Sequence, residues 1–460
     1  MRSALLCMTC LLVTSAPAQE RTPHQQMAVD TFQELVEINT TQSVGDNTKA
    51  AEAMAARLLR AGFSEEDVKV IIPAPRKGNL VARYRSPAPK KPPVLVLAHI
   101  DVVEADPADW SVDPFMFIEK GGYFYGRGTV DDKDEAAIAV ANLIKMKREG
   151  YVPNRDIIIA LTADEEGGPV NGVQHLLAEH FDLVDAEFVI NEGGGGGIFN
   201  GVKSIISVQA AEKVYQSYTL EVTNRGGHSS LPRSDNAIYE LVGALGVIRD
   251  HKFPVSFNPV TRAYFRQTAS TLPSEMGDLM LRLLSDPQDV EAEKVLSKEP
   301  GFNSRMRTTC VATQLEAGHA ENALPQRAKA TVNCRILPGI TPDLVKEKLV
   351  ELIDNKNVSV TPIKEPNPSP PSPLTEEIMA PIMQVSQQMW PGVSVVPVMS
   401  TGATDGLYFR KKGIPVYGVS GIMVDVNDSR SHGRDERILV TSFLEGLEFQ
   451  DRLVRAYTSD

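Results

Sequence analysis

The segment from Val94 to His99 places the strongest constraint on how this 460-residue chain can fold. It follows a Pro-Pro pair and begins with four apolar residues, which is typical of a short strand buried on both faces of a sheet. His99 and Asp101 end this strand two positions apart, so their side chains point the same way in an extended chain. A carboxylate placed there can fix the tautomer of a metal-binding imidazole, and an ordinary polar strand end is the alternative interpretation.

Two further segments with the character of buried strands end in acidic residues. Residues 157–162 lead into Asp164-Glu165-Glu166, and residues 187–191 lead into Glu192, which five glycines follow. Adjacent carboxylates are usually solvated loop charges, but open α/β sheets place ligands at the carboxyl ends of their strands. The sequence therefore predicts that three strands present imidazole or carboxylate groups at one edge of a sheet.

Asp131 and Asp132 stand between a Gly-Arg-Gly turn and a helix predicted from about residue 134 to 147. Helix capping is the conventional interpretation of such aspartates, and one of the two could cap while the other faces a site. His432 lies near the end of the chain, just before the last predicted helix.

Helical and strand-like segments alternate in two parts of the chain, residues 19–213 and 365–460, which indicates one α/β domain with a mixed sheet flanked by helices. Residues 214–364 follow the order β-α-β-β-α-β, which fits a smaller ferredoxin-like α+β domain inserted into the first, with extra helices between 259 and 304. The predicted helices are 29–38, 47–61, 134–147, 236–249, 342–354 and 377–389, and the other predicted strands are 68–72, 79–84, 218–222, 307–315, 329–337, 358–363, 394–398 and 415–419.

The formal net charge of −12 argues against a nucleic-acid partner or an anionic membrane surface, because both require basic patches. Residues 1–18 resemble a signal peptide, with Arg2 before an apolar run and Ala16-Pro17-Ala18 at the predicted cleavage site. We therefore expect an exported protein, periplasmic or secreted. No later apolar run is long enough to predict a membrane span.

Cys310 and Cys334 lie on two strand-like segments separated by a turn region. An exported compartment would permit a disulfide between them, and two buried free thiols are the alternative.

Two imidazoles and three carboxylates make up the candidate metal-binding set, which suits two borderline divalent metals, zinc first and cobalt or manganese as alternatives. The five residues are His99, Asp131, Glu166, Glu192 and His432. Two metals about 4 Å apart that share a carboxylate and a water molecule can hydrolyse an amide bond. Glu165, next to a ligand but not itself one, is placed to act as the general base.

Eight motifs occur in an order that resembles a known family. They are HID, YGRGTVDDK, DEEGG, NEGG, RGGHSSLP, ENALPQ, NCRILPG and HGRDER. The series is similar to the di-zinc metallopeptidases and amidohydrolases that include carboxypeptidase S, aminoacylase, acetylornithine deacetylase and succinyl-diaminopimelate desuccinylase. The resemblance covers nearly all of the chain after residue 18 and implies a zinc-exopeptidase-like fold with a lid that also serves in dimerisation.

The resemblance also implies roles for the metal ligands. Asp131 would bridge the two metals, with His99 and Glu192 completing one site and Glu166 and His432 the other.

Further roles follow from the same resemblance. Asp101 would orient His99, and Glu165 would return a proton to the leaving amine. In the inserted domain, His228 matches a histidine that helps hold the developing oxyanion, often from the partner subunit of a homodimer. Arg335 matches a residue that grips the substrate carboxylate, and Asn322 matches another substrate-binding position. Read without the family, these three are ordinary turn or strand residues.

The sequence departs from the family pattern in three places. Asp134 stands where a glycine is common, Arg434-Asp435 replaces a more frequent Pro-Asn, and five glycines follow Glu192. None of these changes removes a predicted ligand.

The leading hypothesis is an exported di-zinc hydrolase that cleaves the amide bond before a C-terminal amino acid in dipeptides, short peptides or N-acyl amino acids. An N-acyl-amino-acid deacylase of the aminoacylase type is the alternative enzyme. A non-catalytic, metal-stabilised binding protein is the alternative of another class, and the presence of every ligand together with Glu165 argues against it.

Overall fold

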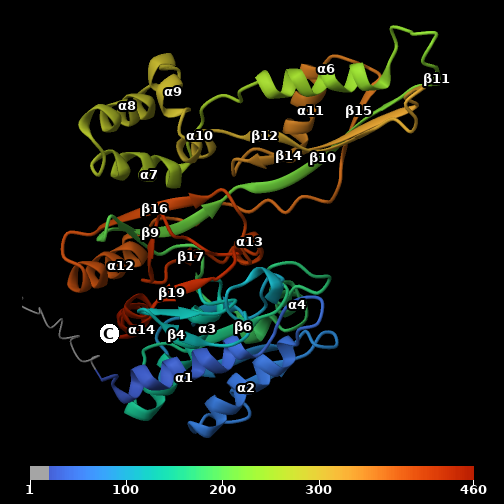
Figure 1. Ribbon diagram of the computed structural model, residues 1–460. Helices are drawn as coiled ribbons and strands as arrows, with labels where there is room; N and C mark the ends of the chain where they lie inside the picture. Colours follow the sequence, from blue (N-terminus) through green and yellow to red (C-terminus); the bar gives the residue numbers. More distant parts are fainter. Residues whose placement is uncertain (1–19) are drawn as a thin grey trace, which may run out of the picture.

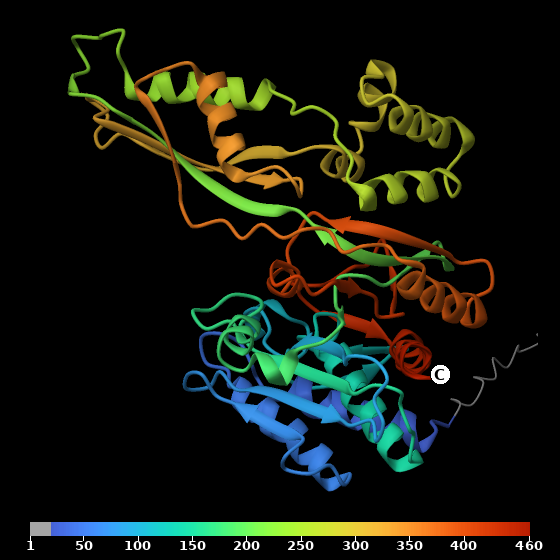
Figure 2. The same ribbon diagram turned by 180° about the vertical axis from the view of Figure 1, so that it is seen from behind.

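A computed structural model of the protein describes residues 20–460 (Figure 1). The predicted signal peptide, residues 1–18, lies outside this part of the chain. A mixed sheet with helices on its faces forms one body, and a smaller sheet with its own helices stands beside it, as Figure 2 shows from behind. The predicted fold class is therefore confirmed. Among the described helices, none has the length and apolar character needed to cross a membrane.

In the described residues, the large sheet has ten strands in the order β1-β2-β6-β3-β7-β17-β9-β8-β18, with β16 paired to β9. β3 runs parallel to both β6 and β7, so the carboxyl ends of these three strands meet at one edge. The strands are β1 (Val68–Ile71), β2 (Asn79–Tyr84), β3 (Val94–His99), β6 (Ile157–Thr162), β7 (Phe188–Asn191), β8 (Gly196–Phe199), β9 (Val202–Glu212), β16 (Ser394–Ser400), β17 (Val416–Gly418) and β18 (Met423–Asp425).

Both faces of the central strands are covered by helices, which explains the unbroken apolar run of β3. Val94 and Val96 join the core beneath α1, α2, α3, α12 and α14, whereas Leu95 and Leu97 join the core beneath α4, α5 and α13. The helices are α1 (Pro23–Glu37), α2 (Asn47–Arg60), α3 (Lys133–Glu149), α4 (Gly172–Glu179), α5 (Phe181–Val184), α12 (Glu376–Met389), α13 (Gly406–Lys411) and α14 (Val440–Thr458). A short 3-10 turn, η1 (Pro107–Asp109), and a small sheet of β4 (Ile118–Lys120), β5 (Tyr123–Tyr125) and β19 (Arg437–Leu439) complete this body.

Helix α1 begins earlier than the apolar spacing predicts. Thr22 and Gln25 form a capping box, and Pro23 occupies the first turn. The predicted start at residue 29 is too late because the apolar periodicity begins only inside the helix.

The smaller body, which we call the lid, contains the predicted order β-α-β-β-α-β as β10-α6-β12-β14-α11-β15. Its strands are antiparallel in the order β12-β14-β10-β15, and α6 and α11 pack on one face. The elements are β10 (Val214–Thr223), α6 (Ala237–Asp250), β12 (Thr309–Ala317), β14 (Arg327–Ile336), α11 (Pro342–Ile353) and β15 (Val358–Pro362), with β11 (Gly227–His228) paired to β13 (Ala323–Leu324) at the tip. The boundaries 214 and 364 stay a prediction.

Extra helices lie beside the lid where the sequence predicts helical material. They have a core of their own and are α7 (Pro259–Ala269), α8 (Ser274–Ser285), α9 (Val290–Leu296) and α10 (Pro300–Met306). Helix α7 packs against β16, and its Val260 belongs to the core of the large sheet. These helices therefore connect the lid to the larger body.

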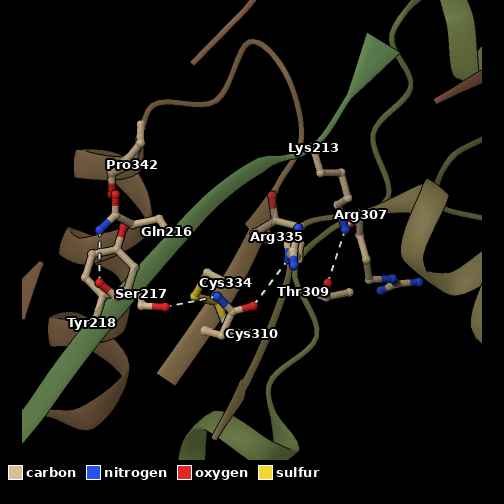
Figure 3. The surroundings of a disulfide bond; sticks show 12 residues. Lys213, Gln216, Ser217, Tyr218, Arg307, Thr309, Cys310, Cys334, Arg335 and Pro342 are labelled. Carbon is tan, nitrogen blue, oxygen red and sulfur yellow. Dashed lines mark hydrogen bonds between the residues drawn. A yellow bond between two sulfur atoms is a disulfide. The ribbon is translucent and has the colours of Figure 1, made fainter. Parts of the chain in front are cut away.

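Cys310 and Cys334 form a disulfide, which decides between the two alternatives (Figure 3). The two residues are directly opposite each other in the register of β12 and β14. Cys334 is fully buried under the lid helices, and Arg335, the next residue, points to the opposite face of the sheet because side chains alternate along a strand.

Replacing Cys310 and Cys334 together by serine is expected to lower the free energy of unfolding by about 3 kcal/mol, because the bond spans 24 residues and restricts the unfolded chain. Chemical denaturation of the oxidised wild type and the double variant measures this difference. Reduced wild-type protein is the control and should unfold at nearly the midpoint of the variant. Equal midpoints for oxidised and reduced wild type would contradict the prediction.

Strand β8 is among the strands that the sequence does not predict, as β9 is too, and glycine is depleted in strands. Its first two residues, Gly196 and Gly197, come from the five-glycine run. A Cβ atom added at Gly196 would lie 2.0 Å from the sulfur of Met423, so close packing requires glycine there.

Candidate metal centre and active site

The five predicted metal ligands lie together at the carboxyl edge of the large sheet. His99 is the last residue of β3, Glu166 follows β6, and Glu192 follows β7, while Asp131 precedes α3 and His432 lies in the loop before β19. The ligand atoms of His99, Asp131 and Glu192 lie within 4.8 Å of one another, and so do those of Asp131, Glu166 and His432. Asp131 therefore belongs to both groups, as the sequence predicts for a bridging residue.

The carboxylate of Asp131 faces an imidazole with each of its oxygens. Its Oδ1 atom is 3.0 Å from Nε2 of His99, and its Oδ2 atom is 3.0 Å from Nε2 of His432. Ser431 donates a hydrogen bond of 2.6 Å to Oδ2, and Nε2 of His432 is also 2.7 Å from Glu166 Oε1. One carboxylate between two nitrogen ligands is the arrangement that two neighbouring cations need.

Burial makes this group of acids costly to ionise without cations. It raises the pKa of Glu165 to about 10 and that of Glu192 to about 8. Hydrogen bonding to Asp131 raises the pKa of His432 to about 9. Burial opposes ionisation of Asp131 as well, but the hydrogen bonds with His432 and His99 lower its pKa overall. Divalent cations would replace these protons, and the nitrogen and oxygen donors fit zinc or a similar metal.

Asp101 supports the site through two different groups. Nδ1 of His99 is 3.0 Å from the backbone carbonyl oxygen of Asp101 and 3.6 Å from its carboxylate. The carboxylate accepts hydrogen bonds from the backbone N–H groups of Glu165, at 3.1 Å, and Glu166, at 3.0 Å. The main chain of Asp101 therefore contacts the imidazole most closely, while its side chain holds the acidic loop in place.

Asp132 is at the N-cap position of α3 but makes no capping hydrogen bond with its side chain. Its Oδ2 atom instead accepts a hydrogen bond of 3.1 Å from the backbone N–H of His99. The capping interpretation of Asp132 is therefore wrong, because its side chain contacts the backbone of the candidate ligand His99 instead. Glu436 fixes the preceding turn, because it accepts a hydrogen bond of 2.8 Å from the backbone N–H of Val130 and pairs with Arg127 at 2.5 Å.

Glu165 and Glu166 line a cavity of about 410 Å³ between the acidic loop and the lid. Arg335 and Tyr215 enter this cavity from strands β14 and β10 of the lid, so the structure brings Arg335 to the side of Glu165.

The guanidinium of Arg335 is half-buried and lies 4.6 Å from the centre of the Tyr215 ring. It donates hydrogen bonds of 3.3 Å to the carbonyl of Thr401 and the side-chain oxygen of Asn333. Within residues 20–460 no carboxylate pairs with it. A half-buried cation without an anionic partner is suited to bind a carboxylate.

His228 and Asn322 are close to each other but not to the metal centre. Both are exposed near the tip of the lid, where β11 pairs with β13, and Ser229 donates a backbone hydrogen bond of 3.0 Å to the carbonyl of Asn322. Nδ1 of His228 is 2.7 Å from the hydroxyl oxygen of Ser230. Figure 1 places β11 at the end of the lid that points away from the larger body. The structure thus separates these two predicted residues from the other eight.

Asp405 is a buried acid at the site that the sequence left unassigned. It lines the cavity of Glu165, accepts a hydrogen bond of 2.6 Å from Asn171, and has a second carboxylate oxygen without a partner among the described residues. Burial raises its pKa to about 7. Its position before α13 suggests a helix cap, yet its side chain makes no capping bond. The sequence alone cannot show that this bond is missing, so it cannot distinguish a cap from a site residue here.

Comparison with known proteins identifies the family of this chain. A sequence model of the family described as Peptidase family M20/M25/M40 matches residues 95–456. The chain belongs to this family. The resemblance of the eight motifs is therefore confirmed, and the protein is a hydrolase of the M20 peptidase and amidohydrolase type.

Two relatives cover most of the chain. The chain is 30% identical to human N-fatty-acyl-amino acid synthase/hydrolase PM20D1 over 81% of its own length and 75% of the relative. It is 29% identical to a probable carboxypeptidase S-like protein of Dictyostelium discoideum, over 79% of its own length and 71% of the relative.

Solved structures share the fold over nearly the whole chain. An M20 metallo-carboxypeptidase from Sulfolobus solfataricus superimposes with a TM-score of 0.68 at 18% identity, covering 94% of this chain and 99% of that one. Human carnosine dipeptidase 1 gives 0.63 at 17% identity, with 94% and 96% covered. A dinuclear metal-binding M20 peptidase from Bacillus subtilis gives 0.59 at 10% identity, with 94% and 97% covered.

Proposed function

We propose that this M20 protein hydrolyses the amide bond that precedes a C-terminal amino acid, in dipeptides, short peptides or N-acyl amino acids. The observation that carries the proposal is the cavity in which Glu165, beside the candidate metal ligands, lies with the unpaired guanidinium of Arg335. A deacylase acting mainly on N-acyl amino acids is the second candidate, and the 30% identity to an N-fatty-acyl-amino acid synthase/hydrolase favours it.

Two divalent cations, zinc first and cobalt or manganese as alternatives, would be held by the two groups that share Asp131. When bound, they supply the positive charge that polarises the scissile carbonyl and makes water a stronger nucleophile. The same charge would favour the ionised form of Glu165, whose pKa burial otherwise raises.

Glu165 then acts as the general base and acid. Its carboxylate takes a proton from the attacking water and returns that proton to the nitrogen of the leaving amine. Asp101 supports this step because its side chain holds the backbone of Glu165 in position.

Arg335 binds the carboxylate at the C-terminal end of the substrate. Replacing Arg335 by alanine is expected to lower the preference of the enzyme for a free C-terminal carboxylate. The ratio of kcat/KM for a dipeptide or N-acyl amino acid to kcat/KM for the corresponding C-terminal amide should fall by about 10- to 100-fold. The reason is that hydrogen bonds to charged groups contribute about 1.5–3 kcal/mol. Steady-state kinetics on matched pairs of acid and amide substrates measures this preference, and it also tests the proposed function.

Lys329→Ala is the matched control, because Lys329 is an exposed cation on the same strand and the same face of the sheet. Equal cleavage of acids and amides by the wild type would argue against the role of Arg335 and for a general amidohydrolase.

We further propose that the protein forms a homodimer in which His228 from one subunit helps hold the oxyanion formed in the other, and that Asn322 binds the substrate. Exposed apolar side chains on edge strand β12, Val311 and Leu315, and on helix α6, Tyr239 and Val242, support a contact between lids. Sedimentation of the protein in solution tests the dimer.

Export to the periplasm or the exterior is also a proposal. It rests on the sequence of residues 1–18, and the disulfide between Cys310 and Cys334 is consistent with an oxidising compartment. Cell fractionation of the full-length chain tests it.

A further inference from the structure

A second cavity, of about 520 Å³, adjoins the metal centre at Asp131 and Glu192. We infer that this cavity holds the acyl part of the substrate and that it selects an extended apolar acyl chain. The inference rests on the proposed function, because it assigns the half of the substrate that Arg335 does not bind.

The position of the second cavity fits this role. The cavity of Arg335 is lined by the ligand Glu166, whereas the second cavity is lined by the ligands Asp131 and Glu192, and the two linings share no residue. A substrate whose carboxylate lies at Arg335 and whose amide lies at the metal centre has its acyl group on the other side of that amide. The second cavity, which begins at the candidate ligands Asp131 and Glu192, lies on that side of the amide.

Apolar side chains form a large part of the walls of the second cavity. They come from β8, β9 and the strand β18 region and are Phe199, Ile205, Ile422, Val424 and Val426. Phe199 is 49% exposed and Val426 is 44% exposed, so both leave apolar surface uncovered. A bound hydrocarbon chain would remove this surface from water, which is favourable in proportion to the area buried.

The charges of the second cavity argue against a charged acyl end. Among its described lining residues there is no lysine or arginine, so nothing would bind a carboxylate such as that of a succinyl group. The acids that line it apart from the candidate ligands, Asp132, Asp134 and Glu135, are buried and follow Asp131 in the chain, and Asp132 contacts the backbone of His99, so they lie beside the metal centre. An ammonium group on the acyl part of a substrate could contact these acids only next to the scissile bond. Farther from the scissile bond, the cavity walls favour neutral apolar groups.

Gly197, the last glycine of the five-glycine run, keeps this space open. A Cβ atom at Gly197 would lie 2.9 Å from Cγ2 of Ile205, 3.1 Å from the ring of Phe199 and 3.6 Å from Cγ1 of Val426. All three neighbours are cavity walls, so any side chain at position 197 would enter the cavity. This gives Gly197, in the unusual glycine run, a role in substrate selection.

The test is a series of N-acyl phenylalanines from acetyl to octanoyl, with the metal-loaded wild type. We expect kcat/KM to rise by up to about fourfold per methylene group, because burying one contributes about 0.8 kcal/mol. In the double variant Phe199→Ser with Val426→Ser, and separately in Gly197→Val, the ratio of octanoyl to acetyl kcat/KM should fall by at least about tenfold.

Val202→Ser is the matched control. Val202 is 63% exposed at the start of β9, close to Phe199 in sequence, but it does not line the cavity. The control should retain the octanoyl-to-acetyl ratio of the wild type.

Binding separates this inference from the proposed function. Calorimetry with metal-loaded Glu165→Gln measures the affinity for the same acyl series without turnover. Affinity that rises with chain length supports the inference even if no substrate is hydrolysed, in which case the proposed function fails. Two results would overturn the inference and leave the proposed function standing. One is hydrolysis and binding that do not change with the length of the acyl chain. The other is a preference for free-amine dipeptides over every acyl amino acid.

Discussion

Replacing Glu165 by glutamine is expected to lower kcat by about 10²- to 10⁴-fold, the range that general acid–base catalysis contributes, while both metal ions stay bound. Glutamine has nearly the same shape but cannot take up the proton of the attacking water. Glu165 is not in either ligand group, and its backbone is held by Asp101, so the substitution should leave the metal centre intact. Steady-state kinetics together with metal analysis by mass spectrometry measures both parts of this result.

Glu179→Gln is the matched control for that variant. Glu179 is the exposed last residue of α4, the helix that follows the acidic loop, and its replacement should change neither kcat nor metal content. A loss of activity in Glu165→Gln that is accompanied by loss of metal would assign Glu165 to metal binding rather than to proton transfer. A variant with nearly wild-type kcat would exclude it as the base.

Replacing Asp131 by asparagine is expected to remove both metal ions and, with them, activity. Each oxygen of Asp131 faces one imidazole of the site, and an amide offers one neutral oxygen in place of two charged ones. The affinity for metal should therefore fall by more than the roughly 10- to 100-fold that is typical of losing an outer partner of a ligand. Metal content after dialysis against a weak chelator measures this loss.

Asp109→Asn provides the control for the loss of one negative charge. Asp109 is exposed at the end of η1 in the same body of the protein, and its variant should keep both ions. Circular dichroism should show that Asp131→Asn is folded. Full metal occupancy of Asp131→Asn after dialysis would contradict a shared ligand.

The metal centre could be predicted from the sequence because its ligands follow buried strands. The runs that end at His99 and before Glu192 are apolar, as strands covered on both faces are, and parallel strands bring their carboxyl ends to one edge. The motif series then supplied the ligands from loops, Asp131 and His432, which periodicity alone cannot place.

Other parts of the site depend on tertiary contacts that no local pattern encodes. Asp405 and Asp132 both stand before helices and look like caps, and only the folded chain shows that Asp132 bonds to the backbone of His99 while Asp405 faces the cavity of Glu165. Strand β8 was missed because glycine has little strand propensity, and its place is fixed by neighbours such as Met423 and Ile205.

The packing of α7 on β16 affects how the lid can move. The chain enters the lid directly from β9 into β10 and leaves it after β15, and two such connections define an axis about which a rigid body can swing. Helix α7 adds a third attachment, and the hydrogen bond from Arg335 to the carbonyl of Thr401 is a further contact between the lid and the larger body. A lid held at three places opposes rotation, so the distance from Arg335 to Glu165 would be set before a substrate arrives. Such a site would select substrates by the spacing between their C-terminal carboxylate and the scissile amide, without closing around them, and would leave the length of the acyl part unrestricted.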